Sequence, residues 1–350
     1  MRPRGGPRPA LDWEEIERLA RRRLGGEERL GPARTRRLEA LYARLAAEVR
    51  PVFLEVVGGL PGGASLPSFQ ALDRVGWLDV NTRIMRRAID PLLAANPVPN
   101  SLLTELGRAG MDRYVAVILA FLSRRVLGQF DPQLFGKEPV EPSGLYLVEP
   151  NIAAWEAEAK VPGEELRRWL ILHEMTHAWQ FAAHPWLRDH LNASLEGVLA
   201  LGRERGLLAR GLALTVGLPR QMGALRQMQA TMSLVEGYSN LVMNLAGRRV
   251  LPAFDELERA YRQRTRERSL LETLFLKLTG LDLKMQQYER GEAFSRLVHE
   301  RHGMAVLNQA WERAENLPRP EELGDSERWY GRVIAPSTPG RRAPRPAPAH

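Results

Sequence analysis

Two histidines four residues apart, with a glutamate directly after the first, have the types and spacing to do chemistry. They are His173, Glu174 and His177, in the order His-Glu-Met-Thr-His. Residues four apart on a helix share one face, so both imidazoles can reach one Zn²⁺ at about 2.0–2.1 Å. The glutamate lies to the side, where it can take a proton from a water molecule that the metal activates. The pattern predicts a hydrolytic zinc site.

The residues around this motif favour a buried helix. Apolar side chains dominate both flanks, and Pro185 is expected to end the helix. At about 100° per residue, one narrow stripe of this helix contains Leu166, Trp169, His173, His177, Gln180 and His184. An alternative is that both motif histidines are core residues satisfied by hydrogen bonds.

A catalytic zinc ion has three protein ligands and one open position, so a third ligand is needed. The metzincin extension would have glycine and histidine where Gln180 and Ala183 stand, which excludes that class. His184 would lie about 16 Å along the helix from His173, too far to share an ion. His190 lies beyond the end of the helix and is an outside candidate only.

Glu236 is the predicted third ligand, because it is an acid within the apolar helical stretch 231–244. A buried carboxylate is costly unless it is paired or bound to metal. Alternatively, it faces solvent or pairs with an arginine. Gly237 would let a neighbouring helix approach, and Asn240 shares the Glu236 face and could orient a ligand. Tyr238 is a candidate catalytic residue that could donate a hydrogen bond to an oxyanion, although a structural tyrosine is equally consistent.

The pattern along the chain predicts an α+β fold that is predominantly helical, with a small sheet. The best strand candidate is 144–148, between two prolines. Helices are expected at 12–23, 35–57, 78–95, 101–127, 163–184, 186–206, 219–246, 252–278 and 282–300.

Composition excludes several classes of protein. The chain has 350 residues and no cysteine, so disulfide scaffolds, thiolate zinc sites, iron–sulfur clusters and cysteine nucleophiles are ruled out. The net charge is +8, and residues 1–10 and 341–350 each contribute three arginines and no acid. Because the charge lies mostly in the two ends, specific nucleic-acid binding by the folded part is not expected.

One domain is expected between two tails. Residues 1–10 are predicted to be a disordered basic tail and 335–350 a disordered Pro/Arg-rich tail. The single domain 11–334 would comprise a helical N-terminal part, 11–135, and a metal-site part, 136–334. The longest apolar run is too short to span a membrane, and no signal segment is visible, so a cytoplasmic protein is expected. The Leu/Arg-rich stretch 193–230 could lie on a membrane surface, but a helix packed on the core is favoured.

Several further segments carry a resemblance to a known family. They are 73–81 (DRVGWLDVN), 127–132 (LGQFDP), 147–152 (LVEPNI), 173–181 (HEMTHAWQF), 185–188 (PWLR), 233–237 (SLVEG) and 284–288 (KMQQY) with Gly291. Across residues 11–334 the chain resembles the bacterial zinc-dependent, zincin-like metalloproteases that are often labelled as associated with deazaflavin-coenzyme biosynthesis.

The resemblance implies a zincin-like metallopeptidase fold with an HExxH active-site helix. It implies that His173 and His177 are ligands, Glu174 the base and Glu236 the downstream acidic ligand. Two positions depart from the family pattern. Members often have histidine where Tyr238 stands and aspartate where Asn244 stands.

These observations predict a zinc-dependent metallopeptidase that holds one Zn²⁺ per chain and hydrolyses a peptide or protein substrate. The strand at 144–148 is expected to be an edge that pairs with the substrate. Candidates for oxyanion stabilisation are Tyr238, Tyr288 and His184. The alternative is a zincin-fold metal-binding protein without proteolytic activity, acting as a regulatory or structural partner. A second rival is a nucleic-acid or membrane-surface binder that uses the arginine-rich tails. The sequence does not indicate an oligomeric state.

Overall fold

The computed structural model describes residues 11–27, 29–62, 64–94, 102–133, 144–199, 218–266 and 281–335. The larger helices are α1 (Trp13–Leu24), α2 (Pro32–Val57), α3 (Arg74–Ala94), α4 (Leu102–Leu122), α5 (Glu149–Ala159), α6 (Gly163–Ala183), α7 (Trp186–Leu199), α9 (Leu218–Val250), α10 (Phe254–Arg266) and α12 (Leu281–His302). Short helices follow, α13 (Met304–Asn308) and α14 (Ser326–Val333), with 3-10 turns η3 (Gln309–Trp311) and η4 (Ala314–Asn316) between them. The strands are β1 (Phe69–Leu72), β2 (Gly128–Phe130) and β3 (Leu145–Val148).

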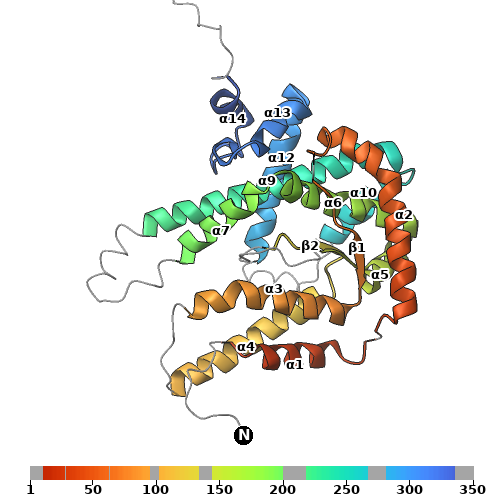
Figure 1. The fold of residues 1–350 in the computed structure, drawn as a ribbon, viewed down its shortest axis with the longest axis vertical. Coiled ribbons are helices and arrows are strands. Elements are labelled where there is room, and N and C mark those ends of the chain that lie inside the picture. Colours follow the sequence, from red (N-terminus) through yellow and green to blue (C-terminus); the bar gives the residue numbers. More distant parts are fainter. Residues whose placement is uncertain are drawn as a thin grey trace, which may run out of the picture.

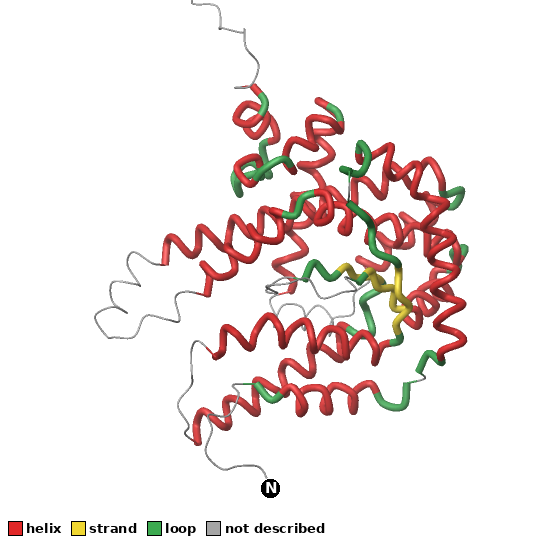
Figure 2. Tube along the Cα trace, in the orientation of Figure 1, coloured by secondary structure: helices red, strands yellow, loops and turns green. Residues whose placement is uncertain are grey.

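The predominantly helical α+β fold is confirmed, with a small sheet enclosed by helices (Figures 1 and 2). Every helix expected from the sequence has a counterpart in the described residues, and the expected ends at 206 and 278 lie outside them. The predicted tails lie almost entirely outside the described residues. None of the helices in the described part of the chain is long and apolar enough to cross a membrane.

Local signals explain where the first two helices begin and end. The Asp12 side chain caps α1 by accepting a hydrogen bond from the backbone N–H of Glu15 at 3.1 Å. Helix α2 begins at Pro32, whose fixed φ suits a first helical turn. It ends at Gly58, which has a φ of 83° that glycine adopts without strain.

The sheet has the strand order β1-β3-β2, so β3 lies in its centre. Strand β3 pairs in parallel with β1, with Phe69 opposite Leu145, and antiparallel with β2, with Gly128 opposite Leu147. The prediction that this strand is an edge available to a substrate is therefore wrong. Both of its edges are already hydrogen-bonded to strands that the sequence analysis did not find. Strand β2 forms the sheet edge that contacts α6.

Two hydrophobic cores hold the helices together. The larger core joins α2, the sheet, α6, α9 and the C-terminal segment. The smaller core lies among α1, α3 and α4, which pack side by side below the sheet in Figure 1. Helix α2 belongs to the predicted N-terminal part but shares the larger core with α6 and α9. The division at residue 135 stays a prediction, and packing joins the two parts.

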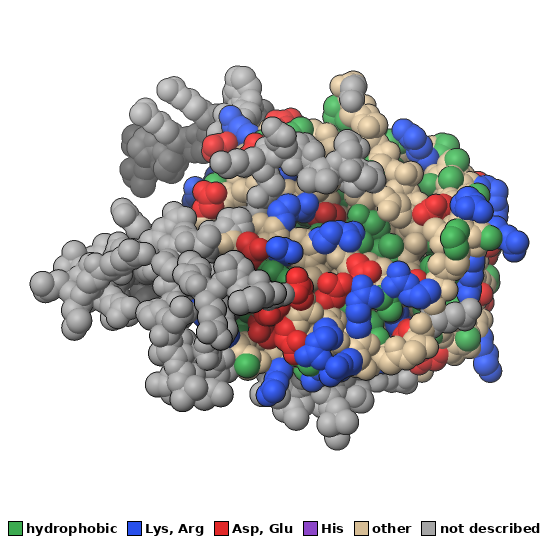
Figure 3. Space-filling model, turned by 60° about the horizontal axis from the view of Figure 1, so that its bottom comes forward, with side chains coloured by type: hydrophobic (Ala, Val, Ile, Leu, Met, Phe, Trp, Pro, Cys, Tyr) green, Lys and Arg blue, Asp and Glu red, His purple; other side chains and the backbone are tan. Residues whose placement is uncertain are grey.

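The face formed by α1, α3 and α4 carries charges of both signs. Figure 3 shows arginine and acidic side chains next to one another over this side of the molecule. On α1, Arg21 pairs with Glu17 at 2.7 Å, and it also contacts Asp79 of α3. Pairs at such exposed positions contribute about 0–1 kcal/mol each, so they shape the surface charge more than the stability.

A close helix crossing fixes the position of α9. A Cβ atom placed on Gly237 would lie 2.1 Å from the carbonyl carbon of Gly291 on α12. A Cβ atom on Gly291 would lie 1.8 Å from the backbone oxygen of Ser233. Only glycine permits this approach of two backbones. The expectation that a helix packs closely at Gly237 is confirmed, and the crossing adjoins Glu236.

Candidate metal centre

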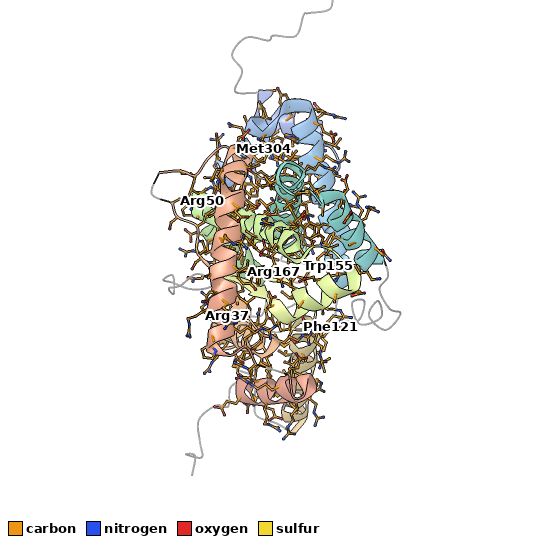
Figure 4. The ribbon with its side chains drawn as sticks, turned by 90° about the vertical axis from the view of Figure 1, so that its right-hand side faces the viewer. Arg37, Arg50, Phe121, Trp155, Arg167 and Met304 are labelled. Atoms are coloured by element: carbon orange, nitrogen blue, oxygen red, sulfur yellow. The ribbon has the colours of Figure 1, made fainter. Side chains whose placement is uncertain are left out.

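Helix α6 positions the His-Glu-Met-Thr-His motif in the middle of the larger core. A buried network anchors the start of this helix. Arg167 forms an ion pair with Glu149 of α5, and the Tyr42 hydroxyl of α2 donates to Glu149 at 2.6 Å. Figure 4 shows Arg167 between α2 and α5. Because these polar groups satisfy one another inside the core, they fix the rotation of α6 and with it the direction of the motif side chains.

His173, His177 and Glu236 come together with their ligand atoms converging. The Nε2 atoms of the two histidines are 3.1 Å apart, and they lie 3.7 and 3.6 Å from Glu236 Oε2. Ligand atoms around a tetrahedral ion at about 2.0–2.1 Å are separated by about 3.3 Å. Within the described ranges, these three residues form the one group of His, Cys, Asp or Glu spaced to hold a metal. The donor set and its spacing fit Zn²⁺.

Burial and neighbouring charges shift the pKa values of His173 and His177 in opposite directions. Burial and the adjacent His177 lower the pKa of His173 to about 4. Burial also lowers the pKa of His177, but Glu236 and other partners outweigh this effect and raise it to about 9. His173 is therefore a neutral imidazole near pH 7, with a lone pair available to a metal.

Two side chains contact the Nδ1 atom of His177, on the side of the ring opposite Nε2. Gln180 Oε1 lies 3.1 Å from His177 Nδ1, and the Ser239 hydroxyl lies 3.2 Å from the same atom. The Gln180 amide donates its N–H to the backbone oxygen of Val235 at 2.9 Å, which turns Oε1 toward the ring. An acceptor at Nδ1 favours the tautomer whose Nε2 lone pair faces the metal position.

The sequence analysis did not assign these two partners, although signals for both were present. Gln180 lies on the same helical stripe as the two histidines. Ser239 follows Glu236 by three residues, so it shares the face of α9 that the ligand occupies.

Glu174 lies in a buried pocket against the backbone of β2. Burial raises the pKa of Glu174 to about 7, and the charge of Glu236 acts in the same direction. The backbone N–H of Phe130 donates to the Glu174 carboxylate and opposes the shift, as does His177. A Cβ atom on Gly128 would lie 2.5 Å from Glu174 Oε1, so a larger residue here would require the Glu174 side chain to shift.

The structure does not bring Tyr238 to the metal-binding cluster. Its side chain is fully buried, stacked on Trp179 at 5.6 Å and edge-on to Trp311 at 5.2 Å. The Tyr238 hydroxyl donates to Asn308 Oδ1 at 2.8 Å. It is two residues from Glu236 and so points to a different side of α9. The phenol joins α6 and α9 to the C-terminal segment, and we assign it no role at an oxyanion.

The other candidates also lie outside the cluster. Burial lowers the pKa of His184 to about 4 and also lowers that of His190, and neither ring belongs to the metal-binding group. Asn240 donates to Glu292 Oε2 on α12 at 3.2 Å, and Glu292 is not one of the three candidate metal ligands. The side chain of Tyr288 lies outside the described residues.

A cavity of about 590 Å³ lies directly against His173 and Glu174. Its walls come from α5, α6, α9, α10 and the segment 124–128 that leads into β2. The volume is in the range of sites that enclose small ligands or several residues of a peptide. The three candidate metal ligands therefore have a cavity of this volume beside them, with the buried carboxylate of Glu174 in its wall.

Two histidines on one helix, a carboxylate from a second helix and a buried glutamate beside them are the kinds of side chain that HExxH metallopeptidases use. The sequence pattern of the zincin-like metallopeptidases matches residues 11–330. The chain therefore belongs to the zincin-like metallopeptidase family. The coenzyme-biosynthesis label and the bacterial origin stay predictions.

A solved structure supports the same assignment. The chain is similar to a protein from Chloroflexus aurantiacus described as a candidate hydrolase with a novel fold. The two share 34% sequence identity and a TM-score of 0.70, over 92% of this chain and 98% of the other. No protein with a curated description matches the sequence.

Proposed function

We propose that the protein is a zinc-dependent peptidase that hydrolyses peptide bonds with Glu174 as general base. The observation that carries this proposal is the convergence of His173 Nε2, His177 Nε2 and Glu236 Oε2, spaced 3.1–3.7 Å apart, beside the buried Glu174 carboxylate and an adjoining cavity. A purely structural zinc site would have no need of a base and would close its fourth position with a protein ligand.

One Zn²⁺ per chain would be held by His173, His177 and Glu236, with Gln180 and Ser239 supporting the second histidine. When bound, the ion supplies Lewis acidity that polarises a peptide carbonyl and makes water easier to deprotonate. Such an ion requires His173 neutral and His177 deprotonated at Nε2, so binding would release the proton that Glu236 stabilises on His177 near pH 7.

Glu174 performs the proton transfers in this proposal. It accepts a proton from the attacking water and delivers the proton to the nitrogen of the leaving amine. In the metal-free site burial raises the pKa of Glu174 to about 7, and a cation bound beside it would lower this pKa again, which favours the carboxylate form that accepts a proton. The Phe130 N–H holds the carboxylate in place, and burial keeps bulk water from competing for it.

Metal analysis of the purified chain and four variants tests the ligand set. We expect one zinc per chain in the wild type and in Glu174→Gln, and a large loss in His173→Ala and Glu236→Ala. Glu292→Gln is the matched control, because this carboxylate bonds to Asn240 but lies outside the cluster. Full zinc occupancy in Glu236→Ala would contradict the third-ligand assignment.

A further inference from the structure

We propose that Asn81 of α3 is a positioning residue for Glu174, acting through Gln129 and strand β2. This inference rests on the proposed peptidase function and names a further residue on which the proton transfers by Glu174 would depend. The strand β2 lies between the Glu174 carboxylate on one face and a pair of side-chain amides on the other.

The two faces of β2 contact different helices. Successive side chains of a strand point to opposite faces, so Gly128 and Phe130 share one face and Gln129 lies on the other. On the first face, the Phe130 ring lies 5.5 Å from the Phe181 ring of α6. A Cβ atom on Gly128 would lie 2.5 Å from Glu174 Oε1 of the same helix. The second face meets α3, which runs beneath the sheet in Figure 1.

Asn81 and Gln129 form a reciprocal pair of hydrogen bonds. Asn81 Nδ2 donates to Gln129 Oε1 at 3.0 Å, and Gln129 Nε2 donates to Asn81 Oδ1 at 3.0 Å. Asn81 Nδ2 also donates to the backbone oxygen of Trp77 at 2.9 Å, one turn earlier on α3. Trp77 is buried in the smaller core, so the asparagine is held in a fixed place. Two opposed bonds between planar amides fix both the distance and the orientation of the middle residue of β2.

Strand β2 is short, so side chains supplement its backbone hydrogen bonds. It has three residues, and among the described strands it pairs with β3 alone. Arg87 of α3 forms a second contact with Asp131, directly after β2, at 3.3 Å. The Arg87 side chain is 25% exposed, so water and salt weaken this ion pair. The amide pair is uncharged and bonds to the middle of the strand, so it acts closest to the backbone that contacts Glu174.

The place of β2 matters because the strand supplies a hydrogen-bond donor to the proposed base. The backbone N–H of Phe130 donates to the Glu174 carboxylate, and Gly128 approaches the same carboxylate closely. Misplacing a reacting group by about 1 Å can cost about 100-fold in rate. Loss of the amide pair should therefore slow catalysis without altering any of the three candidate metal ligands.

Kinetics of the zinc-loaded Asn81→Leu chain test this role. Leucine is close to asparagine in size but can make neither hydrogen bond. We expect kcat for peptide cleavage to fall about tenfold or more, with KM and zinc content each within about twofold of the wild type. Thr82→Val is the matched control, because the buried Thr82 hydroxyl donates within α3, to the backbone oxygen of Leu78 at 2.8 Å. An unchanged kcat in Asn81→Leu, or an equal fall in the control, would overturn the inference.

An exchange of the two amides separates positioning from a general loss of packing. Asn81→Gln and Gln129→Asn each alter the length of the pair, whereas the double variant restores both amides and their summed length. The double variant should recover kcat to within about threefold of the wild type, while each single variant stays lower. Asn81→Leu combined with Gln129→Leu should lower kcat no more than either change alone, because both act through one contact. Additive losses, or no recovery in the exchanged pair, would contradict this.

Amide hydrogen exchange of the full chain keeps this inference distinct from the peptidase proposal, because it needs no substrate. The Phe130 N–H should exchange about tenfold faster or more in Asn81→Leu than in the wild type, with no change in Thr82→Val. If the zinc-loaded wild type cleaves no peptide, the proposed function fails, and faster exchange still supports the view that Asn81 holds β2 against Glu174. If exchange at Phe130 is unchanged in Asn81→Leu, the positioning inference fails whether or not peptides are cleaved.

Discussion

At the candidate metal centre, His177 and Glu174 are each contacted by neighbouring groups that affect their orientation or their protonation. The Nδ1 atom of His177 faces the Gln180 amide oxygen and the Ser239 hydroxyl, so its Nε2 atom is directed to the metal position. Glu174 is held by the Phe130 backbone and raised in pKa by burial. The orientation of His177 and the pKa of Glu174 therefore depend on hydrogen-bond partners and on burial as well as on the motif.

Gln180→Leu should weaken zinc binding by about 10–100-fold, because the substitution removes the acceptor that orients His177. The measurement is a competition titration with a zinc chelator. Gln180→Glu is the paired variant, since it keeps an oxygen at the same place and should retain most of the affinity. Wild-type affinity in Gln180→Leu would show that the tautomer is fixed by Ser239 or by the metal itself.

Glycines allow close approaches between the elements that surround the candidate site. Strand β2 lies against Glu174 at Gly128, and α9 crosses α12 at Gly237 and Gly291. These contacts place a carboxylate of α9 opposite two histidines of α6, and a strand N–H opposite the base. Small changes at the glycines should therefore affect the site without altering any ligand.

Gly128→Ala should lower peptidase activity at least tenfold with zinc content unchanged. The added methyl group would overlap Glu174 Oε1 and push the carboxylate from its place, and misplacing a reacting group by about 1 Å can cost about 100-fold. Activity and metal content would be measured on the same samples. Gly110→Ala on α4 is the control, because nothing lies within 4 Å of its added Cβ. Equal losses in both variants would contradict the account.

Gly291→Ala should lower the free energy of unfolding by about 1–3 kcal/mol or more, because its methyl group would overlap the Ser233 backbone and force α9 and α12 apart. Denaturant unfolding measures the effect. Gly223→Ala on α9 meets no atom within 4 Å, so this control should be neutral or slightly stabilised. If Gly291→Ala is as stable as the control, the crossing is looser than described.

The sequence predicted features that local spacing determines. The larger helices other than α5 followed from apolar periodicity, and His173, His177 and Glu236 followed from motif spacing and from an acid in an apolar stretch. The segment 144–148 was predicted from an apolar run between two prolines, whereas the short strands β1 and β2 are not bounded by proline on both sides, so the central place of β3 was missed. For Tyr238 the sequence left a catalytic and a structural role open, because periodicity does not reveal its packing against the C-terminal segment.

At the scale of the whole molecule, the metal centre joins segments that are distant in the chain. The candidate ligands come from α6 and α9, the proposed base contacts β2, and the cavity adds α5 and α10 (Figure 1). An ion bound to α6 and α9 links two of the helices that build the larger core. Metal binding should therefore stabilise the folded chain as a whole.

Saturating zinc should raise the melting temperature of the wild type, because the folded state binds the ion more tightly than the unfolded chain does. At a free concentration of 100 times Kd the gain is about 2.7 kcal/mol. Calorimetry with and without a chelator measures the shift. Glu236→Ala should show a much smaller shift, and a shift equal to that of the wild type would place the ion elsewhere.

Peptide cleavage by the zinc-loaded wild type beside zinc-loaded Glu174→Gln tests the central claim most directly. The substitution keeps the size of the side chain and all three ligands, and removes only the ability to accept a proton. We predict cleavage of a broad peptide library by the wild type and a rate about 10²–10⁴-fold lower in Glu174→Gln at equal zinc content. Equal cleavage by the two proteins, or none by the zinc-loaded wild type, would contradict the assignment of Glu174 as the base of a peptidase.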